Sequence, residues 1–266
     1  MKSRTLFHPF KVLMMGLMAC VLVLSGCSQG DSKEAEVSKV QEEYHELQES
    51  VVKEPEASAS TDPMDREIDF AKLKEINPEV IAWIYVPNTE INYPILQSTD
   101  DEKYLNTNLN GEPSITGSIY IESFNAADFS DPVTLMYGHT SFNSAGSEKL
   151  ETMFSELHNY EDPDYFNANP YIYIYTPEKT MKYQIFSALT FDNRYIPGEY
   201  QFLLVEDFQN YLDELRNTPG ANVNRDLEVT QESKILTLST CIAPAGQPGS
   251  DQRLLVNATE VEERAR

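Results

Sequence analysis

Cys241 is the residue of this chain best suited to covalent chemistry. The chain has three cysteines, and the other two, Cys20 and Cys27, lie in an N-terminal segment that has the pattern of an export signal. A secreted protein that keeps one cysteine cannot close a disulfide within its own chain, so the thiol either pairs with another molecule or stays free to react. A free thiol becomes a nucleophile when a base or a cation stabilises its thiolate. Cys241 is therefore a candidate nucleophile.

A histidine that could serve as the base follows an apolar, strand-like run at residues 133–137 and a glycine. The chain has four histidines. His8 lies in the export signal, His45 lies in a polar segment, and His158 is expected to be solvent-exposed at the polar end of a helical segment. His139 remains, at a strand end of the kind where catalytic side chains are often presented. We therefore take His139 as the base for the candidate nucleophile.

Arg253 could supply the positive charge that a carbonyl under attack requires. An oxyanion forms in such a reaction, and nearby hydrogen-bond donors or cations stabilise it. Arg253 begins an apolar run that a loop rich in Pro and Gly separates from Cys241, so the two runs are expected to be neighbouring strands. Arg194, Arg216 and Arg225 lie in loops or at helix ends without such a link. Arg253 is therefore the expected third member of the group.

The part of the chain that carries His139, Cys241 and Arg253 has the composition of one globular domain. From Glu67 onward the chain has about 200 residues, enough for a single domain with a sizeable core. Short strand-like runs recur at residues 82–86, 93–97, 117–122, 133–137, 171–176, 182–190, 234–240 and 253–258. Apolar residues have helical spacing at 70–76, 150–157 and 208–215. Many strands with few helices predict a β-barrel or sandwich that carries inserted helices.

Residues 1–27 have the pattern of an export signal. Positive charges are followed by an apolar stretch, residues 12–24, which is shorter than the roughly 20 residues that span a bilayer. Leu24-Ser25-Gly26-Cys27 resembles the lipobox of bacterial lipoproteins, in which the cysteine becomes the first mature residue and its sulfur carries a lipid. This predicts a lipid on Cys27. The alternative is an uncleaved membrane-anchor helix, and either one leaves the rest of the chain outside the cytoplasm.

Residues 28–66 are rich in Glu, Ser, Lys and Gln and poor in large apolar residues. This composition predicts a flexible acidic stalk that holds the catalytic domain, residues 67–266, away from the lipid. Within it, an apolar stripe with helical spacing predicts a transient helix that is able to dock on the domain: Val37, Val40, Tyr44, Leu47 and Val51.

The charge and the residue spacing exclude several classes of function. The chain has 266 residues and a net charge of −23, which argues against nucleic-acid binding because that requires a basic surface. The sequence has neither the spacing of a zinc site nor a phosphate-binding glycine loop, so we expect no metal and no cofactor. Such a charge is compatible with an extracellular, soluble and monomeric catalytic domain.

The candidate residues occur in the order and the context of a known family. The run Thr237-Leu238-Ser239-Thr240-Cys241, with Tyr137-Gly138-His139 upstream and Arg253 downstream, closely resembles the active-site signature of sortases. These are the cysteine transpeptidases of Gram-positive cell surfaces. The resemblance covers residues 67–258.

Three features resemble class B sortases in particular. They are the N-terminal helix that leads into residues 76–84, the pair Tyr104-Leu105 before residues 117–120, and the long helical insert at 206–216 before the cysteine strand. The class implies a mainly β fold, a closed barrel of about eight strands with an N-terminal helical segment. Sortases of this class usually hold the membrane with a transmembrane helix, so the lipobox is a departure that concerns the anchor and not the chemistry.

The resemblance also implies a reaction. Cys241 attacks the threonine carbonyl of a sorting signal resembling Asn-Pro-x-Thr-x and forms a thioacyl enzyme. His139 protonates the leaving amine and then deprotonates an incoming amine, while Arg253 orients the substrate and stabilises the oxyanion. The implied partners are a surface protein that bears the signal and an amine of a cell-wall precursor or of a pilin lysine. The implied place is the outer face of the cytoplasmic membrane of a Gram-positive bacterium.

The resemblance further places five residues in the substrate groove. Ser239 and Thr240 precede the nucleophile in the motif, and Tyr195 and Ile196 match a wall that packs on the peptide. Asn106 follows Tyr104-Leu105 and is expected to contact the asparagine of the signal.

Two other readings stay open from the sequence. L,D-transpeptidases of peptidoglycan also join a histidine to a later cysteine, but they place an arginine just after the cysteine, where this chain has Ile242-Ala243-Pro244. A surface lipoprotein that only binds a ligand, with Cys241 packed and inert, is the alternative from another class, because free cysteines are commonly buried.

Overall fold

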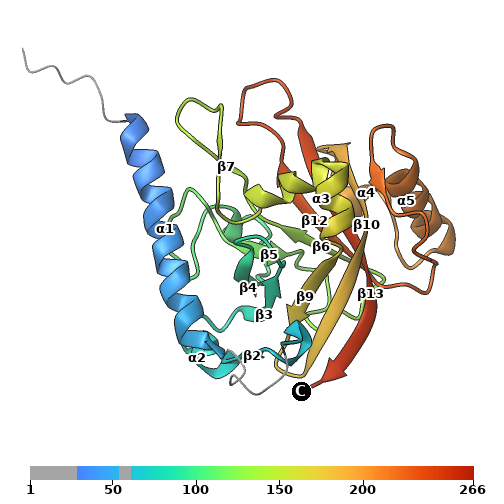
Figure 1. Ribbon diagram of the computed structural model, residues 1–266, viewed down its shortest axis with the longest axis horizontal. Helices are drawn as coiled ribbons and strands as arrows, with labels where there is room; N and C mark the ends of the chain where they lie inside the picture. Colours follow the sequence, from blue (N-terminus) through green and yellow to red (C-terminus); the bar gives the residue numbers. More distant parts are fainter. Residues whose placement is uncertain (1–28, 54–60) are drawn as a thin grey trace, which may run out of the picture.

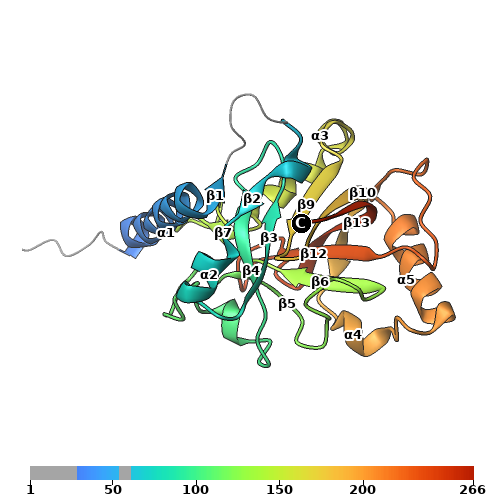
Figure 2. The same ribbon diagram turned by 90° about the horizontal axis from the view of Figure 1, so that it is seen from below.

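Eight strands of the protein close into a barrel (Figure 1; Figure 2). The computed structural model describes residues 29–53 and 61–266. Around the barrel the hydrogen-bonded order is β10-β13-β12-β6-β5-β4-β3-β9, and β9 pairs again with β10 to close the circle. The bounds are β3 Val80–Tyr85, β4 Asn92–Leu96, β5 Ile119–Ile121, β6 Val133–Tyr137, β9 Tyr171–Tyr175, β10 Lys179–Asp192, β12 Ile235–Cys241 and β13 Gln252–Ala265. The expected fold class is confirmed.

The remaining elements lie at the ends of the barrel or on its outside. The helices are α1 Gln29–Val51, α2 Phe70–Ile76, α3 Pro163–Ala168, α4 Ile196–Glu199 and α5 Val205–Asn217, and the 3-10 helices are η1 Pro63–Asp65, η2 Lys103–Leu105 and η3 Ser155–Glu161. Four short strands are β1 Val52–Lys53, β2 Glu67–Ile68, β7 Ser141–Phe142 and β8 Lys149–Leu150, and β11 Asn222–Val223 extends the sheet beside β10. Within the two described ranges, no helix is both long and apolar enough to cross a membrane.

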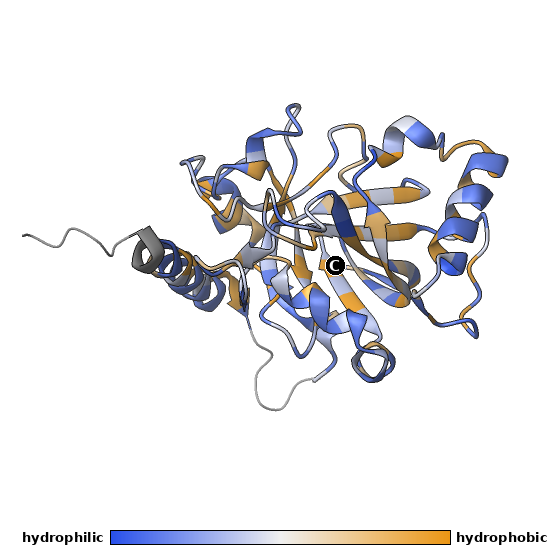
Figure 3. Cartoon of the chain, turned by 90° about the horizontal axis from the view of Figure 1, so that it is seen from above, coloured by the Kyte–Doolittle hydropathy of each residue, from blue (hydrophilic) through white to orange (hydrophobic). Residues whose placement is uncertain are grey.

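Side chains of β12 alternate between the barrel interior and its outer surface. Leu236 and Leu238 belong to the cluster that fills the interior, together with Val256 of β13. Ile235 belongs instead to a cluster on the outside, beneath α5. This alternation follows from the two-residue period of a strand. Figure 3 shows the same division over the whole molecule, with hydrophobic residues along the barrel strands and hydrophilic ones on the outer faces of the helices.

The helix α5 is the expected insert before the cysteine strand, and it covers one outer side of the barrel. One of its faces is buried, through Phe208, Tyr211, Leu212 and Leu215. Glu206 and Asp207 lie in its first turn and Arg216 in its last, an arrangement that the helix dipole favours. Because the buried face packs on β6, β12 and β13, the helix holds the strands that carry the candidate residues.

The helix α1 lies against the opposite side of the barrel from α5, next to β4 (Figure 1; Figure 2). Val37, Tyr44 and Val51 on its apolar stripe are buried. The rings of Tyr44 and Tyr93 meet edge-on with centroids 5.0 Å apart. This part of the segment 28–66 therefore differs from the solvated stalk expected from its composition, because the apolar stripe gains enough burial against the barrel to keep the helix docked.

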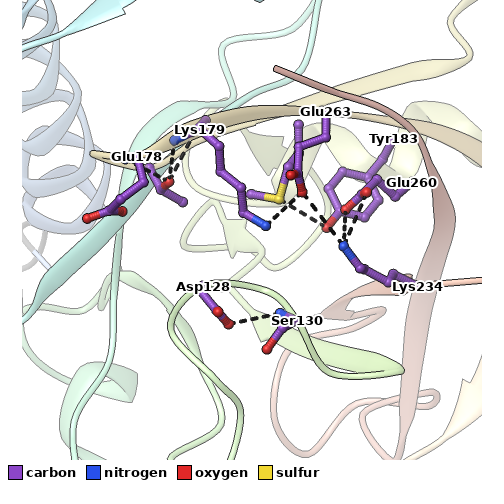
Figure 4. Close-up of polar contacts among 10 residues, drawn as sticks. Asp128, Ser130, Glu178, Lys179, Tyr183, Lys234, Glu260 and Glu263 are labelled. Atoms are coloured by element: carbon purple, nitrogen blue, oxygen red, sulfur yellow. Dashed lines mark hydrogen bonds and ion pairs between the residues drawn. The ribbon is translucent and has the colours of Figure 1, made fainter. Parts of the chain in front are cut away.

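Charged pairs lie at the end of the barrel away from Cys241. Lys179 of β10 lies 2.8 Å from Glu263 of β13, and Lys234, just before β12, lies 3.3 Å from Glu260 and 3.7 Å from Glu263 (Figure 4). The Lys179 ammonium lowers the pKa of the Glu263 carboxyl. These pairs accompany a β13 strand that continues to Ala265, well past the apolar run at 253–258.

Candidate active site

Cys241 and Arg253 are placed together by strand pairing. The strands β12 and β13 are antiparallel, and Cys241 is the direct partner of Arg253, as Ser239 is of Leu255. Directly opposed residues of such a pair have Cβ atoms about 5 Å apart on one face of the sheet. The loop rich in Pro and Gly between the strands is thus the connection of a hairpin, as the sequence predicts.

His139 comes to the same place through a different strand. The strands β6 and β12 are parallel, with Tyr137 beside Ser239, and the Gly138 amide donates to the Ser239 carbonyl over 3.2 Å. Continued by two residues, this register sets His139 level with Cys241. Gly138 is required there because a Cβ at that position would lie 2.7 Å from the ring of Phe154.

The three candidate residues line one pocket of about 270 Å³ at this end of the barrel. Its other lining residues come from η2 and the turn before it, from β5 and its flanks, from β6, β10, β12 and β13, and from the loop after β10: Asp101, Leu105, Ser118, Tyr120, Glu122, Tyr137, Gly138, Phe191, Asp192, Asn193, Arg194, Tyr195, Ile196, Ser239, Thr240 and Leu255. The nucleophile, the base and the guanidinium expected from the sequence are therefore brought together.

A backbone carbonyl holds the ring of His139. Its Nε2 lies 2.6 Å from the carbonyl oxygen of Leu105, which can only accept, so Nε2 carries the proton of this hydrogen bond. The other ring nitrogen, Nδ1, is left to take up or release a proton in the pocket. The side chain is half-buried, as is that of Cys241, so both are reachable from the pocket.

Arg253 and Arg194 both line the pocket but differ in their partners. Arg194 is neutralised by Asp192, with Nε 2.7 Å from Oδ1, and by Glu214 at 3.3 Å. Arg253 donates to the backbone carbonyls of Ser250 and Gln252 and, over the described residues, forms no ion pair with a carboxylate. The charge of Arg253 is therefore available to a bound carbonyl, whereas the charge of Arg194 is balanced by the carboxylates of Asp192 and Glu214.

Comparison with known proteins decides the family. The family model of the sortase domain matches residues 84–261. The chain belongs to the sortase family. Sortase B of Listeria monocytogenes is 32% identical over 173 residues, which cover 65% of this chain and 67% of that protein.

Solved structures agree with this assignment. A Staphylococcus aureus sortase B–substrate complex is 27% identical, has a TM-score of 0.64, and covers 88% of this chain and 99% of that one. A sortase B complexed with triglycine is 26% identical, has a TM-score of 0.65, and covers 87% of this chain and 98% of that one. The protein is thus a class B sortase, a cysteine transpeptidase, and the readings as a ligand-binding lipoprotein or an L,D-transpeptidase are set aside.

The sortase pocket contains a buried carboxyl that sequence reasoning missed. Glu122 is 2% exposed, and the Tyr137 hydroxyl donates to its Oε1 over 2.6 Å. Burial is the main cause that raises the pKa of Glu122, and the nearby Asp101 carboxyl adds to the rise. In the sequence Glu122 is marked only as an acidic residue directly after the apolar strand β5. A solvent-exposed residue at the end of a strand has the same pattern, so the sequence does not predict the burial.

The predicted groove residues of this sortase divide into three groups. Ser239 lies on the same strand face as Cys241, and Tyr195 and Ile196 line the pocket from the loop after β10. Thr240 also lines the pocket, but it points to the opposite strand face, where its hydroxyl lies 2.7 Å from that of Thr140. Asn106 is exposed and is not among the pocket-lining residues.

Three further expectations concern residues outside this pocket. His158 was expected to be solvent-exposed, and this is wrong: it is 8% exposed and contacts the backbone of Cys241, because η3 turns this face toward the barrel. Cys27, the predicted lipidation site, lies outside the described residues. Among the described residues, no group of His, Cys, Asp and Glu could hold a metal ion.

Proposed function

We propose that this sortase cleaves a C-terminal sorting signal resembling Asn-Pro-x-Thr-x after the threonine and transfers the attached protein to an amine. The observation that carries the proposal is the meeting of Cys241, His139 and Arg253 in one pocket. They arrive there from the ends of three strands, because β12 pairs with β13 on one side and with β6 on the other. Such pre-organisation is what acyl transfer requires, because the groups must be in place before the carbonyl is attacked.

In the first half of the reaction the Cys241 thiolate attacks the threonine carbonyl carbon and forms a C–S bond. The oxyanion that results is stabilised by the guanidinium of Arg253, which lies directly across the strand pair from the sulfur. His139 then gives a proton to the departing amine as the C–N bond breaks. The products are a thioacyl enzyme and the released C-terminal part of the signal.

In the second half an amine attacks the thioester. His139, now neutral, takes the proton of the incoming amine, the C–S bond breaks, and the thiolate of Cys241 is restored. The Nε2 bond to the Leu105 carbonyl keeps the ring oriented through both halves, so the same Nδ1 serves as acid and then as base. Atoms and charges balance without a cofactor.

The partners follow from this chemistry. The substrate and triglycine complexes of related sortases support a peptide donor and an amine acceptor for this chain. For the donor, we assign Ser239, Tyr195 and Ile196 to the groove wall, because they surround Cys241 in the pocket. The acceptor is an amine of a cell-wall precursor or of a pilin lysine, and the enzyme acts as a monomer.

We also propose that the protein acts outside the cytoplasm, tethered through its N-terminal segment. Sortases are typically membrane-anchored with an extracellular catalytic domain. A lipid on Cys27 would provide the tether, and metabolic labelling with palmitate tests it. Label in the wild type that is lost in Cys27→Ala supports the lipid, while an unlabelled wild type excludes it.

The deciding experiment uses the full chain with a library of signal peptides and amine acceptors. Mass spectrometry should detect an adduct of the peptide acyl group on Cys241 and a product joined to the amine. The variant Cys241→Ala should form neither. Turnover by Cys241→Ala at the wild-type rate, or a wild type that cleaves no peptide of this kind, would overturn the proposal.

A further inference from the structure

His158 is buried directly behind the nucleophile. It projects from η3, which crosses this end of the barrel, and only 8% of the residue is exposed. Its Nε2 lies 3.1 Å from the carbonyl oxygen of Cys241 and 3.3 Å from the hydroxyl of Thr140. Since a carbonyl oxygen can only accept, Nε2 must carry a proton that it donates to the Cys241 carbonyl.

The second ring nitrogen faces another acceptor. His158 Nδ1 lies 2.7 Å from Oε2 of Glu161, one turn further along η3. The hydrogen bond from His158 is the main cause that lowers the pKa of the Glu161 carboxyl, so that group is ionised and accepts. Both ring nitrogens therefore face an oxygen acceptor, so the ring is held from its two sides. Lys149 of β8 lies 3.8 Å from the same carboxylate oxygen and places a positive charge beside it.

The hydrogen bonds between β12 and β6 show which backbone donor the His158 N–H replaces. On β12 the carbonyl of Ser239 points toward β6 and accepts from the Gly138 amide. The carbonyl of Cys241, two residues on, points the same way, because carbonyl directions repeat every two residues in a strand. The strand β6 has ended by then, at Tyr137, so no backbone amide of β6 continues the ladder. His158 supplies the missing donor.

The same imidazole also joins the two segments that carry the catalytic groups. Thr140 follows His139 directly, and its hydroxyl contacts both His158 Nε2 and the hydroxyl of Thr240, which precedes Cys241. A shift of the imidazole would therefore move the two segments relative to each other. Small displacements of this kind matter because catalytic groups work only within a narrow range of distances.

We propose that His158, held by Glu161, is a positioning residue that fixes the Cys241 backbone against the His139 segment during transpeptidation. The inference rests on the proposed function, since it takes Cys241 as the nucleophile. The imidazole acts through geometry, because its two nitrogens are held 2.7 Å from Glu161 Oε2 and 3.1 Å from the Cys241 carbonyl oxygen. Neither residue lines the pocket, so neither touches the substrate.

Substitution of His158 tests this with the cleavage of the sorting-signal peptide by the full chain. His158→Leu removes the donor and should lower kcat by about 10- to 100-fold, with KM within about twofold of wild type. His158→Gln keeps an amide N–H near the position of Nε2 and should restore most of kcat. If His158 were needed only for folding, its loss would not lower kcat while KM stays near the wild-type value. The N–H donor of His158→Gln would then not restore kcat either.

A matched control is available in His45 on α1. It also faces a carboxylate, Glu90 at 3.7 Å, but both side chains are exposed and neither lines the pocket. His45→Leu should leave kcat unchanged. Equal losses in His45→Leu and His158→Leu would overturn the inference, because the effect would then not depend on contact with Cys241.

Glu161 provides a second route if His158→Leu does not fold. Its side chain is 44% exposed, so Glu161→Leu leaves the core intact and removes the partner of Nδ1. We expect kcat to fall about fivefold and to recover in Glu161→Gln, whose amide can donate to Nδ1 of a neutral ring that still presents Nε2–H. Wild-type kcat in Glu161→Leu, with Cys241→Ala inactive, would overturn this inference alone. An active Cys241→Ala would instead overturn the proposed function.

Discussion

Cys241 and Arg253 are direct partners in the antiparallel pair β12–β13, so a β-ladder and not a loop sets the distance between the thiol and the guanidinium. The parallel pairing of β6 with β12 brings His139 level with them from the other side. Cys241, the candidate nucleophile, is thus held directly by its pairing with β13, and the pairing with β6 ends only two residues before it, at Ser239. This explains how residues far apart in the sequence keep one geometry without a metal or a disulfide among the described residues.

Arg253→Lys should lower kcat/KM for the signal peptide by about 10- to 100-fold. Lysine keeps the charge, but an ammonium cannot reproduce the planar fork that spans the Ser250 carbonyl and a bound oxyanion. Because the lost contacts are to backbone carbonyls at the rim, the thermal midpoint should stay within a few degrees. Steady-state kinetics with calorimetry measures both. Unchanged kinetics would assign Arg253 to the fold and not to the reaction.

His139→Ala should lower kcat by about 10²- to 10⁴-fold, the usual contribution of a positioned acid–base group. The thiol of Cys241 remains, so the variant should still be alkylated by iodoacetamide, only more slowly. Rapid-quench kinetics of acyl-enzyme formation would measure the loss. His45→Ala, an exposed histidine on α1, is the control and should retain full activity. A His139→Ala variant as fast as this control would exclude an acid–base role.

The strands and the candidate triad could be predicted from the sequence because their signals are local. Each of the barrel strands contains an apolar or alternating run, and the order His139, Cys241, Arg253 follows from three such runs. The end of β13 could not be predicted. Residues 260–265 are mostly charged and resemble a solvated tail, and only their pairing with β10, with contacts such as Lys179–Glu263, makes them a strand.

The parts that escaped prediction depend on tertiary contacts. The burial of Glu122 and of His158 results from which face η3 and β5 turn toward the barrel, and neighbouring residues in the sequence do not determine this. The docking of α1 also depends on tertiary contacts. Its stripe predicts a helix, but whether the helix stays on the domain depends on the apolar surface that β4 offers, including Tyr93.

Tyr44→Ala should lower the free energy of unfolding by about 3 kcal/mol, because it removes a buried ring from the interface between α1 and β4. Burial also raises the pKa of Tyr44 to about 12, in keeping with a hydroxyl that water does not reach. Chemical denaturation of the full chain measures the change. Lys39→Ala, on the exposed face of α1, removes only the surface pair with Glu43 and should change stability by about 0.5 kcal/mol or less. Equal effects of the two would mean that α1 is not docked in solution.

Asn257→Ala should lower the free energy of unfolding by about 2 kcal/mol. The Asn257 amide accepts from the Thr237 hydroxyl at 2.8 Å and donates to Ser187 at 3.1 Å, and Thr237 in turn contacts the Tyr211 hydroxyl of α5 at 2.8 Å. Removing the amide takes one partner from the buried Thr237 hydroxyl, which keeps Tyr211, and takes the Asn257 donor from the buried Ser187 hydroxyl. Urea titration should give a lower midpoint with an unchanged slope. Asn110→Ala, at an exposed turn, should have no measurable effect.

Glu122→Gln should make the enzyme more stable at neutral pH and should leave its stability unchanged near pH 4. Burial raises the pKa of Glu122 above its ordinary value of 4.5, so the folded protein keeps this proton at pH values where the unfolded chain has lost it. Wild-type stability therefore falls as the pH rises from 4.5 through the raised pKa, and a glutamine has no proton to lose. Thermal midpoints of wild type and variant should converge below pH 4.5 and separate above it. The control Glu232→Gln changes an exposed carboxyl and should show no such separation. If Glu122→Gln were less stable than wild type at neutral pH, the ionised carboxylate of Glu122 would be favoured in its pocket, and the prediction would be wrong.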